Sequence, residues 1–539
     1  MLAPTLVTAV SLALGLAVPS ERAVQRVTTA PPVFFVSGHG WGHGVGLSQY
    51  GAYGYAQHGW SYDRIVQHYF PGTTLGAAPV AKVRVLIGDG LSSVTVSSKQ
   101  PFAVRDGSGK SYTLPAGAYT FGPGFKLQVD PAAPTKALTA PLVFSPGVSA
   151  LALGRRAYRG SFQVAKQGRK LQVVNVVGLD RYLWGVVPSE MPRTWSAEAL
   201  KAQAVAARSY ALAQIRGGGS FDLYDDTRSQ VYGGIGAESP ATTDAVNATA
   251  GKVALYRGRV ADTMFFSTSG GRTASVQDVF PNATPVPYLV SVPDPYDSIS
   301  PYHSWGPLRY AARTLVRKLH VPGRLLDVQA TAAPSGRVRS VLAKGTEGDV
   351  SVAGADVRKA LGLRSTWFSV GVLSLTAPAD PVVYGARAKL AGKARGAPVV
   401  LQQRPYGGAW TDVGPLSPAG GAVAPVVSPK ISTAYRVVAA GKVASGLVRV
   451  VVAPRVTLHV PPDLSGFWGM VHPFSLAGAR VEIQRLAASG WVPVASTTVG
   501  ANGRFTLARP VTVGIAYRAR VAPGGGFVPG FSASLRVAP

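Results

Sequence analysis

One glutamate has a setting that suits a proton donor. Glu190 lies in the segment VVPSEMP, between Pro188 and Pro192, which restrict the backbone around it. A carboxylate held on a stiff turn can act as a positioned general acid. The positive end of the helix that follows would lower its pKa, whereas burial against apolar neighbours such as Met191 and Trp195 would raise it. A capping role at that helix is the alternative to catalysis.

A strong helix must position this turn. Ser196 is a favourable N-cap, and Glu198 lies in the first turn, where a carboxylate suits the helix dipole. Residues 197–215 are rich in Ala, contain no Gly or Pro, and are soon followed by three glycines, so they predict a helix packed closely by neighbouring backbone. Lys201 and Arg208, seven residues apart, share one face of it. They form either a solvated basic stripe or a ligand contact.

Two further segments contain residues that chemistry could use. In a block rich in Gly, His and aromatic residues, Val33 to Leu75, His39 and His43 have the i, i+4 spacing of a helical metal pair. Alternating glycines make a helix implausible there, so these histidines either line a sugar cleft or shape a loop. Ser267 and Ser269 lack the strand-to-helix elbow of a nucleophile, and we expect a turn whose backbone amides meet a sugar. Aromatic side chains that either stack on sugars or fill the core are Trp184, Tyr232 and Trp305.

Several motifs resemble one known family. GVVPSEMP followed by LKAQAVAARSYAL is similar to the core signature of the stage II sporulation protein D family, the amidase-enhancer domain. Other matching stretches are YDDTRSQVYGG, AVNATAGKVALYRG, FFSTSGGRT, PYLVSVPDPYD, GADVRKALGLRSTWF and the SGHGWGHGVGLSQYG block. Together the motifs cover Val33 to about Val370, which makes the resemblance specific.

The resemblance implies a peptidoglycan lytic transglycosylase that acts on glycan strands whose stem peptides have been removed. The family's catalytic glutamate corresponds to Glu190. Its arginine in the following helix corresponds to Arg208, for which we expect a substrate-positioning role. Further substrate contacts are expected from Lys201, His43, Gln49, Tyr50, Gln230, Tyr232, Ser267, Ser269 and Gly270. The alternative is a non-catalytic wall-binding protein that stimulates an amidase, and a third hypothesis is a cationic surface adhesin.

A lytic transglycosylase needs only one carboxylate. A hydrolytic glycosidase usually needs two, one as acid and one as base or nucleophile. When the muramic C6 hydroxyl closes a 1,6-anhydro ring, one residue can protonate the leaving oxygen and then accept the hydroxyl proton. No second carboxylate stands in a comparably strict motif, although Asp225, Asp226 and Asp262 remain candidates.

The sequence departs from the family pattern in two ways. Some members carry a His/Cys cluster near the QVY motif that can hold zinc, but here Arg228 and Ser229 stand there and the chain has no cysteine. We therefore expect no such zinc site and no cofactor. The Gly/His block also precedes the core, whereas in better-known members it follows. We expect residues 36–50 of this permuted block to contact the Glu190 turn or the Ser267–Gly271 loop, with Ser48 capping a short helix through Tyr50.

Charge and composition limit the partners. The 539 residues include 54 Lys and Arg against 25 Asp and Glu, a net charge of +29 that attracts polyanions. The basic residues are scattered and no nucleic-acid motif is present, so we expect an anionic wall or membrane surface rather than nucleic acid. Leu6 to Val18 is a short apolar run, of signal-peptide rather than membrane-span length, although no Lys or Arg precedes it. We expect a secreted, wall-associated protein; a buried strand or helix is the alternative.

An internal repeat defines the tail. Gln403-Arg404 matches Gln484-Arg485 and Trp410 matches Trp491, each with a shift of 81, while Tyr435-Arg436 matches Tyr517-Arg518 with a shift of 82. Val- and Leu-rich segments broken by Gly, Pro and Ser predict two β-sandwiches, Ig-like in size. The sequence thus predicts a mixed, β-rich α+β core with one prominent Ala-rich helix, followed by these sandwiches. The expected parts are a signal peptide and linker (1–32), the core (33–370, with the block at 33–75 and the rest at 80–370), and the modules 372–455 and 456–539.

Overall fold

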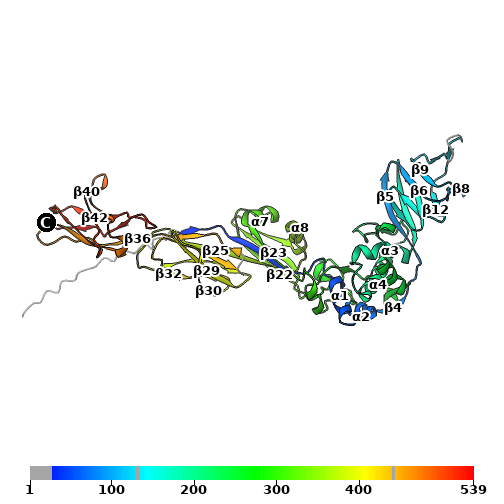
Figure 1. The fold of residues 1–539 in the computed structure, drawn as a ribbon, viewed down its shortest axis with the longest axis horizontal. Helices are drawn as coiled ribbons and strands as arrows, with labels where there is room; N and C mark the ends of the chain where they lie inside the picture. The colour runs from blue at the N-terminus through cyan, green and yellow to red at the C-terminus, as the bar shows by residue number, and fades with distance from the viewer. Residues whose placement is uncertain (1–26, 129–133, 216, 281, 440–442, 539) are drawn as a thin grey trace, which may run out of the picture. The chain divides into compact units, whose positions relative to one another are not determined.

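The computed structural model describes residues 27–128, 134–215, 217–280, 282–439 and 443–538. The apolar run at residues 6–18 lies outside these ranges. The described chain divides into two compact units (Figure 1): one spans Phe34–Gly371, and the other contains residues 372–538 together with residues 27–33. No helix in the described ranges has the length and apolarity needed to span a bilayer.

Two β-sheets form one hydrophobic core of the Phe34–Gly371 unit. The larger sheet has the order β17-β5-β16-β15-β12-β7-β8, and the smaller has the order β14-β13-β6-β9. Valine, leucine and phenylalanine side chains at alternate strand positions fill one shared core between them. The strands are β5 (Lys82–Leu91), β6 (Val94–Ser98), β7 (Phe102–Arg105), β8 (Ser111–Leu114), β9 (Gly117–Phe121), β12 (Leu142–Ser145), β13 (Leu151–Leu153), β14 (Arg156–Tyr158), β15 (Ser161–Gln167), β16 (Lys170–Gly178) and β17 (Leu223–Tyr224).

The predicted Ala-rich helix is α4 (Ala197–Ala213), and it separates two hydrophobic cores. Ala204, Ala207 and Ala211 belong to the core of the sheets, whereas Leu200 and Val205 belong to a second core formed with other helices. Small side chains on every face let neighbouring elements pack closely against α4. Since the helix is apolar on all sides, it is also buried on all sides. The neighbours of α4 are α1 (Gln49–Gln57), α2 (Tyr62–Tyr69), α3 (Leu179–Glu190) and α5 (Pro240–Ala248). Figure 1 shows α1, α2 and α3 around it.

A third part of this unit carries a three-stranded sheet, β22-β23-β24, with two helices beside it. Next to it, β2 (Val33–His39) neighbours β21 (Ser304–Ala311), and the His39 amide donates to the carbonyl oxygen of Trp367 at 2.9 Å, just before β25 (Phe368–Pro378). The remaining elements are β22 (Leu325–Ala332), β23 (Val338–Gly345), β24 (Asp349–Ala353), α7 (Ala312–Leu319) and α8 (Gly354–Leu361).

The tail repeat appears as two sheets with the same strand order. The first is β30-β29-β33-β34 with β35 beside β33, and the second is β40-β39-β42-β43 with β44 beside β42. In the second module these strands share one core with β37, β38 and β41. Bounds are β29 (Val399–Pro405), β30 (Thr411–Leu416), β33 (Thr433–Ala439), β34 (Val443–Ala444), β35 (Val448–Val450), β37 (Arg455–Val456), β38 (Gly466–His472), β39 (Arg480–Ala487), β40 (Gly490–Thr498), β41 (Arg504–Ala508), β42 (Ala516–Val521), β43 (Gly530–Phe531) and β44 (Leu535–Arg536).

One aligned pair of the repeat was off by a residue. The glutamine equivalent to Gln484 is Gln402 rather than Gln403: Arg436 Nε donates to Gln402 Oε1 at 2.9 Å, and Arg518 Nε donates to Gln484 Oε1 at 2.8 Å. The sequence could not separate two adjacent glutamines, because only the strand register decides which one faces the arginine.

Candidate functional site

Glu190 is the last residue of α3, and its sequence neighbours reach into both hydrophobic cores. Val187, one turn before it, is buried in the sheet core, and Met191, directly after it, is buried in the helical core. The expectation of a turn at a helix N-terminus was wrong, because α3 continues through Pro188 to Glu190. The carboxylate therefore lies at the negative end of a helix dipole, which does not favour its ionised form.

Burial controls the protonation of Glu190. Desolvation raises the pKa of its half-buried carboxyl to about 7, and a hydrogen bond from Gln49 acts in the opposite direction. Gln49 Nε2 donates to Glu190 Oε2 at 3.4 Å. No second carboxylate among the described residues contributes to this shift. Glu190 can thus hold or release a proton near neutral pH.

The Gly/His block brings Gln49 to this position, and its predicted contacts are confirmed. Ser48 caps α1 by accepting from the Gly51 amide at 3.2 Å, and it also accepts from the Ser269 amide at 3.2 Å. The Tyr50 amide donates to the Ser267 carbonyl oxygen at 3.0 Å. One serine hydroxyl thus joins the start of α1 to a loop 221 positions away, and α1 carries Gln49 to Glu190, 141 positions away in the chain.

The loop at residues 267–271 does not offer free amides to a ligand, contrary to expectation. The Gly270 amide donates to Asp297 Oδ2 at 2.7 Å, and the Gly271 amide donates to Ser269 Oγ at 3.0 Å. Ser269 is fully buried, and the Ser267 hydroxyl pairs with that of Thr268 at 3.2 Å. The loop supports α1 rather than presenting hydrogen-bond donors.

Two aromatic rings of α1 pack on Trp195, which follows Glu190 closely in the sequence. The Tyr53 ring stacks on Trp195, with centroids 4.6 Å apart and planes at 6°, and the Tyr50 ring meets Trp195 edge-on at 4.8 Å. All three are half-buried. Rings fixed in this way keep an apolar surface of defined orientation that is partly open to solvent.

Arg208 is not placed to touch a substrate, which corrects the expected positioning role. Its side chain is completely buried and forms an ion pair with Asp180 at 2.7 Å. Its other hydrogen bonds are donated to the carbonyl oxygens of Lys252 and Val246, at 3.0 and 3.2 Å. Arg208 therefore connects α4 to α3 and to the segment around α5.

Other expected substrate contacts also have internal partners. Gln230 is buried, accepting from the Tyr182 hydroxyl at 3.2 Å and donating to the Ala207 carbonyl oxygen at 3.3 Å. Tyr232 is buried in the sheet core and donates to Asn175 at 3.1 Å. These corrections share one reason: polar groups in a core must be satisfied there and are not available to a ligand.

His43 and Lys201 are likewise engaged. His43 Nε2 lies 2.9 Å from the Phe265 carbonyl oxygen, and its Nδ1 accepts from the Val45 amide at 3.1 Å. Burial lowers the pKa of His43 to about 4, so this ring is neutral and shapes the loop. Lys201 Nζ pairs with Glu198 at 2.7 Å, and Glu198 also accepts from the Tyr62 amide at 2.7 Å.

The three alternative carboxylates differ in environment. Asp226 pairs with Arg228 at 2.7 Å, which lowers the pKa of Asp226 to about 2. Burial raises the pKa values of Asp225 and Asp262. In addition to burial, the charges of Glu190 and Asp225 both raise the pKa of Tyr182, and those of Asp262 and Glu190 both raise the pKa of Tyr210. Asp225 and Asp262 therefore share a tyrosine neighbour with Glu190, but neither contributes to the pKa shift of Glu190.

Two buried aspartates were missed by the sequence reasoning. Asp294 accepts from the Tyr69 hydroxyl at 2.9 Å, and burial raises the pKa of Asp294 to about 7. Asp297 holds His303 Nδ1 at 2.5 Å in addition to the Gly270 amide. The DPYD motif that carries both was a sequence signal. In the described ranges, no three His, Asp or Glu side chains gather closely enough to hold a metal ion.

Comparison with known proteins places one region in a family. Residues 167–256 match the family model described as Stage II sporulation protein. Stage II sporulation protein D of Bacillus subtilis strain 168 is 33% identical over 220 residues, which cover 36% of this chain and 61% of that protein. The amidase enhancer of the same strain is 42% identical over 115 residues, 21% of this chain and 15% of that protein.

Other similarities are shorter or weaker. An uncharacterized protein of Brachyspira hyodysenteriae is 40% identical over 138 residues, 25% of this chain and 37% of that protein. Among solved structures, a two-domain fibronectin type III segment of chicken tenascin covers 31% of this chain and 97% of that chain, at 15% identity and a TM-score of 0.20. The matches span less than two thirds of the length of each of these three curated relatives.

Proposed function

The chain belongs to the stage II sporulation protein D family through the domain that includes residues 167–256, and from this premise we propose that it is an exported peptidoglycan lytic transglycosylase. The substrate we propose is the glycan strand without stem peptides, and Glu190 is the single acid and base. One observation carries the proposal: Glu190 is half-buried with a pKa of about 7, and no carboxylate in the described part of the chain contributes to that shift.

In the proposed reaction Glu190 gives up one proton and takes back another. Protonated Glu190 donates to the glycosidic oxygen while the bond from that oxygen to C1 of the muramic residue breaks. The ionised Glu190 then accepts the C6 hydroxyl proton as O6 of the same residue bonds to C1. The first proton stays on the leaving hydroxyl and the C6 hydroxyl proton replaces it on Glu190, so the carboxyl ends protonated as it began. No water is consumed, and a second carboxylate is not required. Gln49 orients the Glu190 carboxylate, and Tyr50 is the next residue after Gln49 on α1.

Location and partners belong to the same proposal. The apolar run Leu6 to Val18 supports export, and the net charge of +29 supports contact with an anionic wall. Similarity to the amidase enhancer favours a second candidate function, non-catalytic stimulation of a cell-wall amidase. Under that alternative the glycan is bound but not cleaved.

Product analysis in labelled water tests the proposal. Denuded glycan strands are incubated with the protein in water enriched in ¹⁸O and the new ends are measured by mass spectrometry. We expect 1,6-anhydro ends without label, since O6 closes the ring. Labelled reducing ends would indicate a hydrolase and contradict the proposal. Absence of new ends, with stimulation of an added amidase that is equal in wild type and Glu190→Gln, would establish the enhancer instead.

A further inference from the structure

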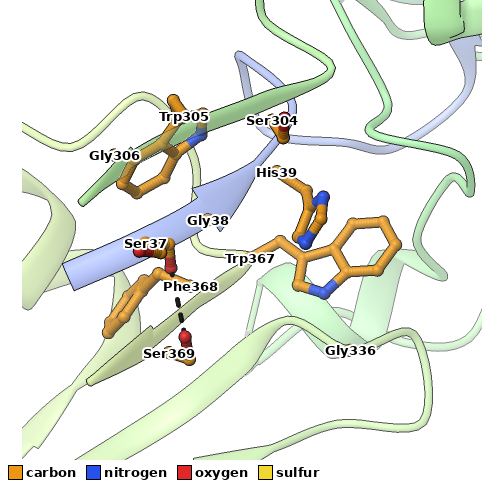
Figure 2. A pocket seen from close by; sticks show the side chains of 10 residues that line it. All are labelled: Ser37, Gly38, His39, Ser304, Trp305, Gly306, Gly336, Trp367, Phe368 and Ser369. Carbon is orange, nitrogen blue, oxygen red and sulfur yellow. Dashed lines mark hydrogen bonds between the residues drawn. The ribbon is translucent and has the colours of Figure 1, made fainter. Parts of the chain in front are cut away.

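A cavity of about 510 Å³, which Glu190 does not line, lies where β2, β21 and the start of β25 meet. Figure 2 shows two indoles, Trp305 and Trp367, with the His39 ring near Trp367 and serine side chains around them. This volume falls within the range of about 300–1,000 Å³ that is usual for small-ligand sites. The expectation that Trp305 either stacks on a ligand or fills the core left this site unassigned.

Trp305 is held rigidly against the backbone of β2. Gly38 has no side chain, and a Cβ there would collide with the Trp305 ring, so only glycine permits this approach. Trp305 Nε1 donates to the Gly40 carbonyl oxygen at 2.9 Å. The ring is thus oriented before any ligand arrives, and its N–H group is already in use.

Trp367 is fixed in a similar way. Its indole lies against Gly336, where a Cβ would again collide with the ring. Its carbonyl oxygen accepts from the His39 amide at 2.9 Å, and Ser365 Oγ donates to the His39 carbonyl oxygen at 2.5 Å. The His39 and Trp367 rings have centroids 5.1 Å apart. Two glycines and a short backbone pairing therefore fix both aromatic walls.

The cavity is lined without formal charge in a chain whose net charge is +29. Its lining, as far as the structure describes the chain, includes no Lys, Arg, Asp or Glu; the polar side chains are those of His39, Ser37, Ser304 and Ser369. Burial, followed by the nearby His303, lowers the pKa of His39, which is therefore neutral at pH 7. The site thus offers apolar ring surface beside neutral hydrogen-bonding groups.

We propose that this cavity binds a neutral pyranose of a glycan strand, as a site separate from Glu190. The apolar face of a pyranose suits an indole wall, and its hydroxyl or acetamido groups suit hydroxyl and imidazole partners. A proline-rich peptide also binds aromatic grooves, but the Trp305 N–H that could donate to a peptide carbonyl is occupied. An anion finds no cation among the lining side chains.

Titration calorimetry with tetra-N-acetylchitotetraose tests this site in the full chain carrying Glu190→Gln, which keeps the probe intact. Trp367→Ala should lower the affinity at least about tenfold, and Trp367→Phe, which keeps a ring, should retain most of it. Ser304→Arg places a bulky cation at the exposed rim without touching the core and should also abolish binding there. Trp410→Ala and Ser145→Arg, in elements that do not line the cavity, are the matched controls.

The outcomes separate this site from the chemistry at Glu190. Loss of binding in Trp367→Ala and Ser304→Arg supports the pyranose site even if wild type makes no anhydro ends. Unchanged titrations in folded Ser304→Arg and Trp367→Ala would overturn it, and Ser304→Arg decides alone if Trp367→Ala does not fold. Trp367-dependent binding of a decaproline peptide, without binding of the chitotetraose, would also overturn it and identify a peptide groove.

Discussion

Glu190 combines desolvation with access, the two properties that a proton donor needs near neutral pH. Burial alone would fix the proton on the carboxyl, and full exposure would leave it ionised. The half-buried position at the end of α3 gives a pKa of about 7, while Gln49 stabilises the ionised form. Both protonation states are then populated near neutral pH, and the proposed cycle needs each of them in turn.

Replacing Gln49 tests this balance. Gln49→Leu removes the hydrogen bond that lowers the pKa of Glu190, so that pKa should rise above 7. The rate of glycan cleavage requires protonated Glu190 and falls as the pH rises through its pKa; this descending limb should therefore move to higher pH. The measurement is the rate between pH 5 and pH 9. Gln57→Leu, at the exposed end of the same helix, should leave the limb in place; a limb that moves to lower pH in Gln49→Leu would contradict the assignment.

At the scale of elements, α4 supports the site without joining it. Arg208 illustrates the distinction: the helix and its face could be predicted from Ala content and spacing, but the depth of burial could not. Burial depends on α3 and α5 packing over that face, which only the tertiary structure reveals. The same reason explains Gln230. The Gly/His block was predictable to a greater extent, because Ser48 has the capping chemistry that α1 requires.

Arg208→Met should therefore affect stability rather than chemistry. The change breaks the ion pair with Asp180 and leaves two carbonyl oxygens without their donor, at a cost of about 2–4 kcal/mol in the free energy of unfolding. The pH profile of the folded protein should not change. Denaturant unfolding and the pH profile measure the two effects. Arg181→Met, an exposed arginine on α3, is the control. If Arg208→Met shifted the descending limb of the pH profile without changing stability, Arg208 would belong to the catalytic site after all.

At the scale of the whole molecule, Glu190 and the repeated modules of the tail belong to different compact units. Residues 34–371 contain Glu190 and the cavity lined by Trp305 and Trp367, and the tail repeats one strand order twice. Both modules place an arginine over a tryptophan: Arg436 lies over Trp410 at 4.0 Å, and Arg518 lies over Trp491 at 4.4 Å. This arrangement suits a spacer or tether.

A chain of residues 34–371 should retain turnover on soluble glycan. It should bind intact walls less well, because it loses the repeated modules and part of the positive charge. Turnover assays and wall sedimentation at two salt concentrations measure the two properties. Loss of soluble turnover in a truncated chain that remains folded would show that the tail takes part in cleavage.

The central claim is that one carboxylate performs both proton transfers, and the rate of anhydro-end formation by Glu190→Gln tests it most directly. Gln keeps the size of the side chain but carries no titratable proton, so the rate should fall by about 10²–10⁴-fold while glycan binding persists. Glu347→Gln, at an exposed position, should match wild type. An unchanged rate in Glu190→Gln would contradict the account.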